Sequence, residues 1–436
     1  MNRVALALLA VIMLPSLLNA YPVDGYSETG IRRIEGVRLV EDGVIPGRRQ
    51  PPGALLPTDR VDLRLLDYPD LDLPAPDPAF TRQLLELLGS NASHYGVAVL
   101  DLSDPAHPRY AEHREDHRQN VGSVGKLVVA LSVFQGLADA WPDDIAKRRQ
   151  ILRDTMITAD AFSHWDHHKI KIFDVAAKTL VRRTMKDGDR GNLWEYLDWT
   201  LSVSSNAAAA MTMREAMLIR RYGKDYPPPE AEIRRFFAET PKRELQELFI
   251  TTFFEPITRN GLDLEQLRQG SFFTRTGKQL VPGGGNSYGT ARELMKFTLR
   301  MEQGRLVDEF SSRAIKRLLY MTERRIRYAS SPALTDSAVY FKSGSLYSCK
   351  EEEGFVCGQY LGNVKNYMNS VAIVETATAE HRLDYIVTLL SNVLRKNSAV
   401  VHQTLATRIH RLIEKAHPGS GSPGKPQQPP EKEPES

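Results

Sequence analysis

The chain has 436 residues, of which 42% are hydrophobic and 25% are charged, so it is long enough to bury a sizeable core. Its 57 basic and 54 acidic side chains leave a formal net charge of only +3. This balance gives no reason to expect a nucleic-acid partner, and the composition is that of an ordinary soluble globular protein.

The first twenty residues have the pattern of a secretory signal peptide. Asn2 and Arg3 form a short positive segment before the apolar run VALALLAVIMLPSLL, and LNA, ending at Ala20, offers small residues for cleavage. The apolar run is shorter than a typical membrane span, and no later stretch reaches about 18 apolar residues. We therefore expect a secreted or periplasmic bacterial protein with no stable membrane span after signal removal. An uncleaved signal anchor is the alternative.

Residues 21–77 are rich in Pro, Gly, Arg and Asp, as in PGRRQPPGALLP and DYPDLDLPAPDP, which is typical of loops and linkers. The segment GIRRIEGVRLVED could hold one or two short strands. We interpret this region as an N-terminal extension of unknown purpose.

The next elements alternate between helix and strand. PAFTRQLLELLGS, residues 78–90, has the apolar spacing of an amphipathic helix. YGVAVLDL, residues 95–102, predicts a strand, and PRYAEHRED, residues 108–116, predicts its hairpin partner. A helix follows at Ser123, and residues 140–310 are mostly helical in pattern.

Strand character returns in the last third of the chain. DSAVYFKSGSLYS, residues 336–348, NSVAIVETA, residues 369–377, and DYIVTLLS, residues 384–391, are rich in β-branched and aromatic residues. VVHQTLATRIHRLIEKA, residues 400–416, predicts an amphipathic helix, and residues 417–436 have the composition of a disordered tail.

This order predicts one α+β domain over residues 78–416. An antiparallel sheet would be built from both chain ends and flanked by helices, with an all-helical lobe inserted between them.

The helix start QNVGSVGKLVVAL places Ser123 three residues before Lys126, so both side chains share one helical face. A lysine there could take the proton of the serine hydroxyl if burial or a neighbouring cation lowers its pKa. A serine helix cap followed by a surface lysine has the same pattern.

Two later segments could complete a site for serine chemistry. Ser204 and Asn206 precede an Ala-rich helix and offer a hydroxyl and an amide, although both residues also favour helix caps. The second segment, FKSGS, lies on an expected strand, where the glycine would let a substrate backbone approach closely. Its members are Lys342, Ser343, Gly344 and Ser345.

These three segments, in this order, resemble the S-x-x-K, S-x-N and K-[ST]-G motifs of the serine β-lactamase and penicillin-binding protein superfamily. The resemblance covers roughly residues 78–416 and is strongest to class A β-lactamases, whose buried helix and SDN-Ala-rich helix have similar segments here. Ser205 replaces the usual Asp of the second motif, and Ser343 replaces the commoner Thr of the third.

The resemblance implies a role for each motif residue. Ser123 would be the acylated nucleophile, Lys126 its base or relay partner, and Ser204 the donor of a proton to the leaving nitrogen. By the same resemblance, Asn206 would bind the side-chain amide of the substrate, and Lys342 would support the electrostatics of the site. Ser343 and Ser345 would bind the substrate carboxylate. The backbone N–H groups of Ser123 and Ser345 would form the oxyanion hole. The arginine that often helps to bind this carboxylate has no clear match.

Class A enzymes also carry a glutamate that activates the deacylating water, in the pattern E-P-x-L-N. This chain has Glu255-Pro256-Ile257-Thr258-Arg259-Asn260, with one extra residue and no Leu. Glu255 is therefore our candidate deacylation base, and an ordinary Glu-Pro at a helix end is the alternative.

The expected function is thus a serine hydrolase that hydrolyses the amide of β-lactams through an acyl-enzyme, without cofactor or metal. A peptidase or transpeptidase acting on the D-Ala-D-Ala stem peptide of peptidoglycan is the alternative enzyme, and a non-catalytic binding protein on the same fold is the alternative of another class. The partner would be a small-molecule β-lactam or a peptidoglycan stem peptide.

Two further signals concern cysteine and histidine. An oxidising compartment would permit a disulfide between Cys349 and Cys357, whose spacing fits a bridged hairpin loop, with free thiols as the alternative. SHWDHHKI echoes half of a metallo-hydrolase motif, but no further ligand cluster completes it, which favours a solvated loop. That segment contains His164, Asp166, His167 and His168.

Overall fold

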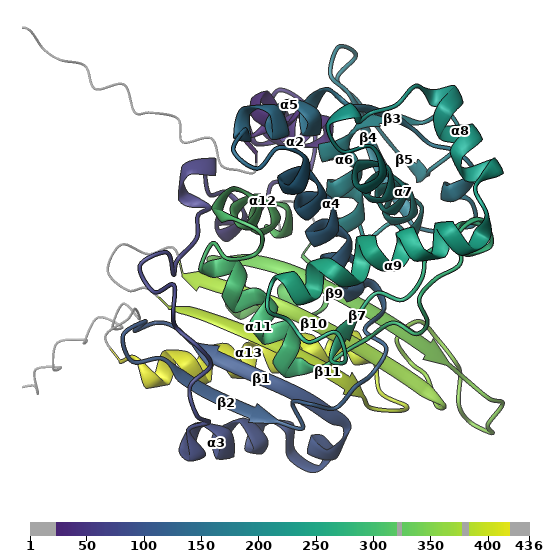
Figure 1. Ribbon diagram of the computed structural model, residues 1–436. Coiled ribbons are helices and arrows are strands. Elements are labelled where there is room, and N and C mark those ends of the chain that lie inside the picture. Colours follow the sequence, from purple (N-terminus) through teal and green to yellow (C-terminus); the bar gives the residue numbers. More distant parts are fainter. Residues whose placement is uncertain (1–22, 321–324, 377–382, 419–436) are drawn as a thin grey trace, which may run out of the picture.

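The computed structural model describes residues 23–320, 325–376 and 383–418. The proposed signal peptide and residues 419–436 of the predicted tail lie outside these ranges. The chain forms a mixed lobe around an antiparallel sheet and a second lobe made mostly of helices (Figure 1).

The central sheet has five strands in the order β2-β1-β11-β10-β9, all antiparallel. Its early and late strands pair directly, with Val99 of β1 opposite Val387 of β11. The strands are β1 (Tyr95–Asp101), β2 (Arg109–His113), β9 (Ser337–Ser348), β10 (Lys365–Thr376) and β11 (Asp384–Asn392). The expected sheet from both chain ends is confirmed, as are the strands predicted within residues 95–116 and 336–391.

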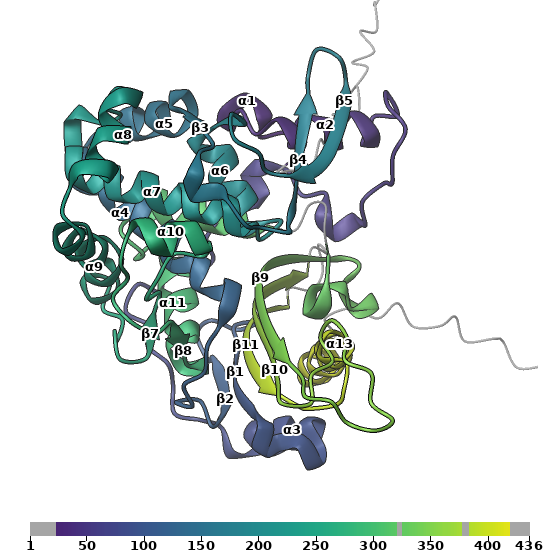
Figure 2. The ribbon, with the colours of Figure 1, turned by 90° about the vertical axis from the view of Figure 1, so that its right-hand side faces the viewer.

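Both faces of this sheet are buried. Val97 and Val99 of β1 lie in an apolar cluster with α3 (Pro78–Leu88) and α13 (Ser398–Ala416), while Ala98 and Leu100 face the larger core of the protein. Alternate side chains of a strand point to opposite faces, so one short apolar strand contributes to both cores. Figure 2 shows α13 on one side of the sheet and α11 (Ala291–Glu302) on the other.

The helical lobe is organised around α4 (Lys126–Ala140), which is apolar on nearly all sides and almost completely buried. Among the described residues, Gly122–Ala140 is the one helix long and apolar enough to cross a membrane, and 83% of its window is buried inside the protein. The other helices of this lobe are α5 (Ile145–Asp154), α6 (Leu193–Leu201), α7 (Asn206–Tyr222), α8 (Glu230–Glu239), α9 (Lys242–Arg259), α10 (Arg275–Leu280) and α12 (Glu309–Leu319).

Short strand pairs interrupt the region that the sequence predicts to be mostly helical. The longest is the hairpin of β4 (Lys169–Asp174) and β5 (Thr179–Thr184). The others pair β3 (Met156–Thr158) with β6 (Arg190–Asn192), and β7 (Leu267–Arg268) with β8 (Tyr288–Gly289).

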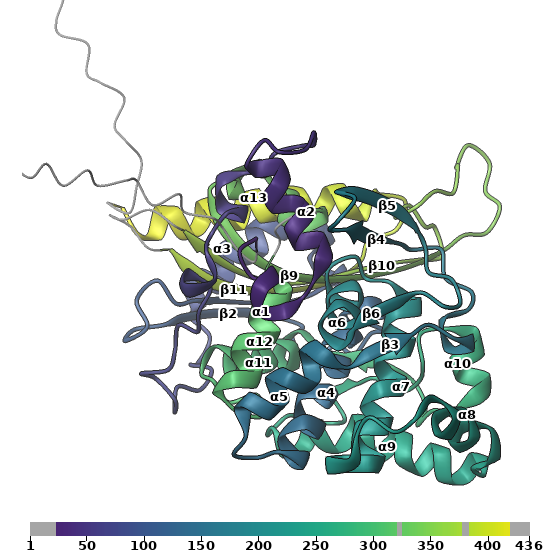
Figure 3. The ribbon, with the colours of Figure 1, turned by 90° about the horizontal axis from the view of Figure 1, so that it is seen from above.

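The N-terminal extension is helical where short strands were expected, so that prediction is wrong. It contains α1 (Tyr26–Thr29) and α2 (Arg32–Glu41). Ile31, Ile34 and Val37 recur every three residues and are all buried, which is the spacing of one helix face. Gly36 lets α2 lie directly on β4, because a Cβ there would stand 2.9 Å from the Phe173 ring. Figure 3 shows α2 beside β4 and β5.

A buried ionic cluster fastens the extension to the domain. Lys316 of α12 is fully buried, and its Nζ lies 2.8 Å from a Glu302 oxygen and 2.5 Å from Glu375 Oε1 on β10. Arg64 of the extension donates to Glu375 Oε2 at 2.7 Å. Arg64 thus joins the extension to the central sheet through Glu375, a carboxylate that it shares with Lys316.

We expect Lys316→Met to lower the free energy of unfolding by about 3–5 kcal/mol, because it leaves Glu302 and Glu375 buried with one cation fewer. Urea unfolding measures the change. The matched control is Lys224→Met at an exposed lysine, which should alter stability by less than about 0.5 kcal/mol. Equal effects of the two substitutions would contradict a structural role for the cluster.

Candidate active site

Ser123 lies in the turn Gly122–Gly125, which runs directly into α4. The flanking Val121 and Val124 are completely buried in the larger core, so the turn is fixed by its apolar side chains. Ser123 itself lines a cleft of about 720 Å³ between the two lobes. The structure thus confirms the helix start that the sequence predicts and leaves the serine accessible.

Lys126 is completely buried beneath Ser123. Its Nζ lies 3.0 Å from Ser123 Oγ, 2.7 Å from the Ser204 carbonyl oxygen and 2.8 Å from Asn206 Oδ1. Burial lowers the pKa of Lys126 to about 7, although the Asp166 carboxylate opposes the shift. A neutral amine can donate to the two carbonyl-type oxygens and accept the hydroxyl proton of Ser123.

Ser204 joins two lysines. Its backbone φ of 63° lies in the left-handed region, which a residue with a Cβ adopts only at a cost. Its Oγ lies 2.9 Å from Nζ of Lys342 and 3.4 Å from Nζ of Lys126. The strained backbone therefore holds one hydroxyl where it can exchange protons with either amine.

The strand β9 approaches the Ser123 turn closely at Gly344. A Cβ on Gly344 would stand 2.1 Å from the Val121 carbonyl oxygen and 2.6 Å from the Ser123 nitrogen. The sequence predicts this glycine to admit a substrate backbone, whereas the structure shows that it admits the protein's own backbone. This close approach brings the peptide of Ser345 next to the nucleophile, since a Cβ on Gly122 would lie 3.3 Å from the Ser345 nitrogen.

Arg327 supplies the cation that the sequence left unassigned. Its guanidinium donates to Ser343 Oγ at 2.7 Å, to Ser345 Oγ at 3.2 Å and to the Tyr360 hydroxyl at 2.9 Å. It lines the cleft together with these serines. Arg327 precedes Lys342 by fifteen positions and belongs to no motif, so only the folded chain reveals their proximity.

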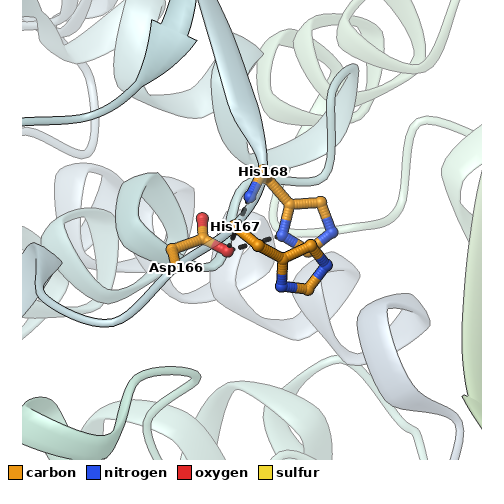
Figure 4. Close-up of side chains that lie close together, drawn as sticks. All are labelled: Asp166, His167 and His168. Atoms are coloured by element: carbon orange, nitrogen blue, oxygen red, sulfur yellow. Dashed lines mark hydrogen bonds and ion pairs between the residues drawn. The ribbon is translucent and has the colours of Figure 1, made fainter.

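Asp166 contacts the second motif directly, which the sequence did not predict. One carboxylate oxygen accepts from Ser205 Oγ and from the Ala207 N–H, each at 2.9 Å, and the other lies 2.6 Å from His168 Nδ1 (Figure 4). Burial alone would raise the pKa of Asp166, but these hydrogen bonds hold it well below its usual range.

The segment around Asp166 is therefore part of the cleft wall and not a solvated loop. His167 and His168 stack on each other and line the cleft. The three side chains could offer ligand atoms within 4.8 Å of one another. Both oxygens of Asp166 are already engaged, one at the start of α7 and the other by His168, so Asp166 acts as a helix cap.

Glu255 does not lie at this site, and its prediction as deacylation base is wrong. It belongs to α9 and forms ion pairs with Arg220 and Arg259. Arg220 follows Asn206 by fourteen residues of α7, which corresponds to about 21 Å along the helix. The Glu-Pro pair is thus the ordinary helix-end sequence, and it lies at the far end of α7 from the motifs.

An amide and an aromatic ring lie beside the lysine. Phe273 places its ring centroid 4.7 Å from Lys126 Nζ. The Gln269 side chain is buried and packs over Gly125, and its Oε1 has no hydrogen-bond partner among the described residues.

None of the described residues that line the cleft is an aspartate or a glutamate.

The predicted disulfide is confirmed: Cys349 and Cys357 are bonded. The bridge closes the loop between β9 and β10, shortly before Tyr360. Because Tyr360 accepts a hydrogen bond from Arg327, the bridged loop also helps to hold the cleft's guanidinium.

Comparisons with known proteins found a matching family model and similar structures. The model of the β-lactamase enzyme family matches residues 79–392. The structure is similar to a β-lactamase from Sphaerobacter thermophilus, with a TM-score of 0.50, 12% identity, and coverage of 78% of this chain and 99% of that one. A β-lactamase from Chitinophaga pinensis gives a TM-score of 0.46, 15% identity and coverage of 77% and 99%.

A further similar structure is a single-residue mutant of PBP-A in an acyl-enzyme complex with penicillin G. It has a TM-score of 0.48 and 12% identity, and the match covers 79% of this chain and 100% of that one. A sequence search of curated proteins found no significant match.

We expect Ser204→Gly and Ser204→Ala to slow any reaction at Ser123 equally, by about 10²-fold or more, because both lack the hydroxyl that contacts Lys126 and Lys342. They should differ in stability. Glycine relieves the left-handed strain that alanine keeps, so Ser204→Gly should be the more stable by about 1 kcal/mol. Penicillin acylation followed by intact mass, and urea unfolding, give the two readouts. Wild-type acylation in either variant would contradict the relay.

Proposed function

Because the chain belongs to the β-lactamase enzyme family, we propose that it is a serine hydrolase that forms an acyl-enzyme at Ser123 with β-lactams. The observation that carries the proposal is the 3.0 Å contact between Ser123 Oγ and the buried amine of Lys126. Unlike the buried Lys316, which two carboxylates neutralise, Lys126 has its pKa lowered and contacts a serine hydroxyl, which is typical of a catalytic base.

Acylation follows from the positions of three side chains and two backbone N–H groups. Ser123 Oγ attacks the amide carbonyl carbon while its proton passes to the neutral Lys126 amine. The oxyanion is held by the N–H groups of Ser123 and Ser345 on the two adjoining backbones. As the carbon–nitrogen bond breaks, the Ser204 hydroxyl protonates the leaving nitrogen and takes a proton from an adjacent ammonium group.

The substrate class follows from Arg327 and its neighbours. Its guanidinium and the hydroxyls of Ser343 and Ser345 form a cationic end to the cleft, suited to a carboxylate. Asn206 presents its amide on the opposite lobe and would orient the acyl side chain. In a β-lactam a carboxylate lies next to the ring nitrogen, and in a stem peptide it lies at the C-terminus. Either carboxylate would suit this end of the cleft.

Release of the acyl group by water would not use Glu255 as its base, contrary to the expectation from the sequence. In the described part of the cleft no carboxylate can activate water, so Lys126 would have to serve as the base a second time. We therefore propose that deacylation is slow relative to acylation. The same observation favours a second candidate function, a peptidase or transpeptidase of peptidoglycan stem peptides that β-lactams inhibit.

The proposed compartment is the periplasm or the exterior of a bacterial cell. The Cys349–Cys357 disulfide supports this proposal, because such bonds persist in oxidising environments.

We expect penicillin G to produce a Ser123 adduct that accumulates and then decays as hydrolysed drug is released. Intact-protein mass spectrometry over time measures both. Ser123→Ala should show no adduct, and Glu255→Gln should show the wild-type lifetime because Glu255 is remote. A wild-type protein that gives neither adduct nor hydrolysed drug would contradict the proposed function. A longer-lived adduct in Glu255→Gln would restore the discarded role of that residue.

The acylation rate should rise with pH and level off above a midpoint of about 7. The base must be unprotonated, and burial lowers the pKa of Lys126 from 10.5 to about 7, so protonation removes activity below that point. Stopped-flow acylation across pH 5–10 measures the profile. His168→Gln is the matched control and should keep the midpoint; loss of the midpoint in this variant would assign it to the imidazole instead.

A further inference from the structure

A second cavity of about 910 Å³ adjoins the catalytic cleft. Three segments enclose it: α2 with the following loop at residues 45–51, the β4–β5 hairpin, and residues 325–335 before β9. Figures 2 and 3 show α2 and the hairpin side by side above the edge of the sheet that β9 forms. The extension and the hairpin together create this cavity, since they supply most of its lining.

The lining of this cavity is strongly cationic. It contains no aspartate or glutamate among the described residues, although the chain as a whole has nearly equal numbers of acids and bases. The basic residues that line it are Arg33, Arg48, Arg49, Lys171, Arg182 and Arg325.

The positive charge is only partly compensated. Arg33 is paired with Asp198, but Arg48, Arg49 and Arg182 have no side-chain partner in the described ranges. Arg325 donates to the carbonyl oxygens of Leu334 and Ser337, and its buried Nε has no described partner. Burial lowers the pKa of Arg325 to about 10, as expected for a guanidinium held among neutral oxygens. Such a cavity attracts anions.

The cavity lies next to the catalytic cleft and shares a wall with it. Arg182 lines both spaces, and Arg325 of the cavity is two residues from Arg327 of the cleft. The cleft of about 720 Å³ already has the size of a complete small-molecule site. A ligand that occupies both spaces would therefore be a longer chain than a β-lactam.

We infer that this cationic cavity binds a carboxylate-bearing peptide segment of the acyl substrate, beyond the bond that Ser123 attacks. The inference rests on the proposed function and extends it, because it assigns the N-terminal extension to substrate selection. Guanidinium groups bind carboxylates through paired N–H donors, which suits Arg48 and Arg49 to an acidic peptide. A phosphate polymer is the competing anionic ligand.

The test compares two peptide thioesters that share the scissile acyl group and differ only in a distal Glu-Glu or Gln-Gln extension. Wild-type protein should show a kcat/KM at least tenfold higher for the Glu-Glu substrate, expressed mainly in KM. The double variant Arg48→Gln/Arg49→Gln should lose this preference while reacting normally with the Gln-Gln substrate and with penicillin. Arg82→Gln, at an exposed arginine of α3, is the matched control and should keep the preference.

Direct binding separates this inference from the proposed function. Fluorescein-labelled Glu-Glu peptide is titrated into Ser123→Ala, with and without the two arginine substitutions, and anisotropy is recorded. If the peptide binds Ser123→Ala more tightly when Arg48 and Arg49 are present, the result supports carboxylate binding in the cavity. This holds even if penicillin fails to acylate Ser123. The inference is overturned if wild-type protein has no Glu-Glu preference, or if the preference survives in the double variant. Inorganic tripolyphosphate displacing the peptide at far lower concentration than free triglutamate would overturn the assignment to carboxylates.

Discussion

The active site depends on the complete burial of one amine. Lys126 lies between the serine turn, the loop at Ser204 and the start of α7, and it bonds to each of them. A charged ammonium in that position would have to be removed from water, which favours the neutral form. The same burial that orders three segments around the amine therefore also makes it a base. Packing and chemistry are set by one side chain.

The sheet completes this arrangement from the other lobe. Lys342 on β9 reaches the Ser204 hydroxyl, and Gly344 allows β9 to approach the serine turn at backbone distance. β9 is in turn held by β10, which pairs with β11, which pairs with β1 from the beginning of the domain. Residues that are more than two hundred positions apart thus meet because an antiparallel sheet closes over both ends of the chain.

The sequence was sufficient where local pattern determines structure. Strand 95–101 and the part of β10 from residue 369 onward carry enough β-branched and apolar residues to be recognised, and the three motifs mark the segments that meet around Lys126. It was insufficient where proximity depends on the fold. Arg327 has no motif, and Asp166 reaches the second motif from forty residues away. Glu255 shows the reverse failure, because a plausible local pattern in α9 lies at the wrong end of α7.

Asp166 also shows how a departure from the family pattern can be balanced elsewhere in the chain. The resemblance expects an aspartate in the middle of the second motif, where this chain has Ser205. The carboxylate of Asp166 accepts from the Ser205 hydroxyl and from the Ala207 N–H in the first turn of α7, so negative charge returns to the positive end of the helix dipole. That charge also favours the ammonium form of Lys126 and opposes the shift caused by burial. The lysine can lose a proton to solvent and still accept one from Ser123, because these two influences on its pKa are opposed and leave it near neutrality.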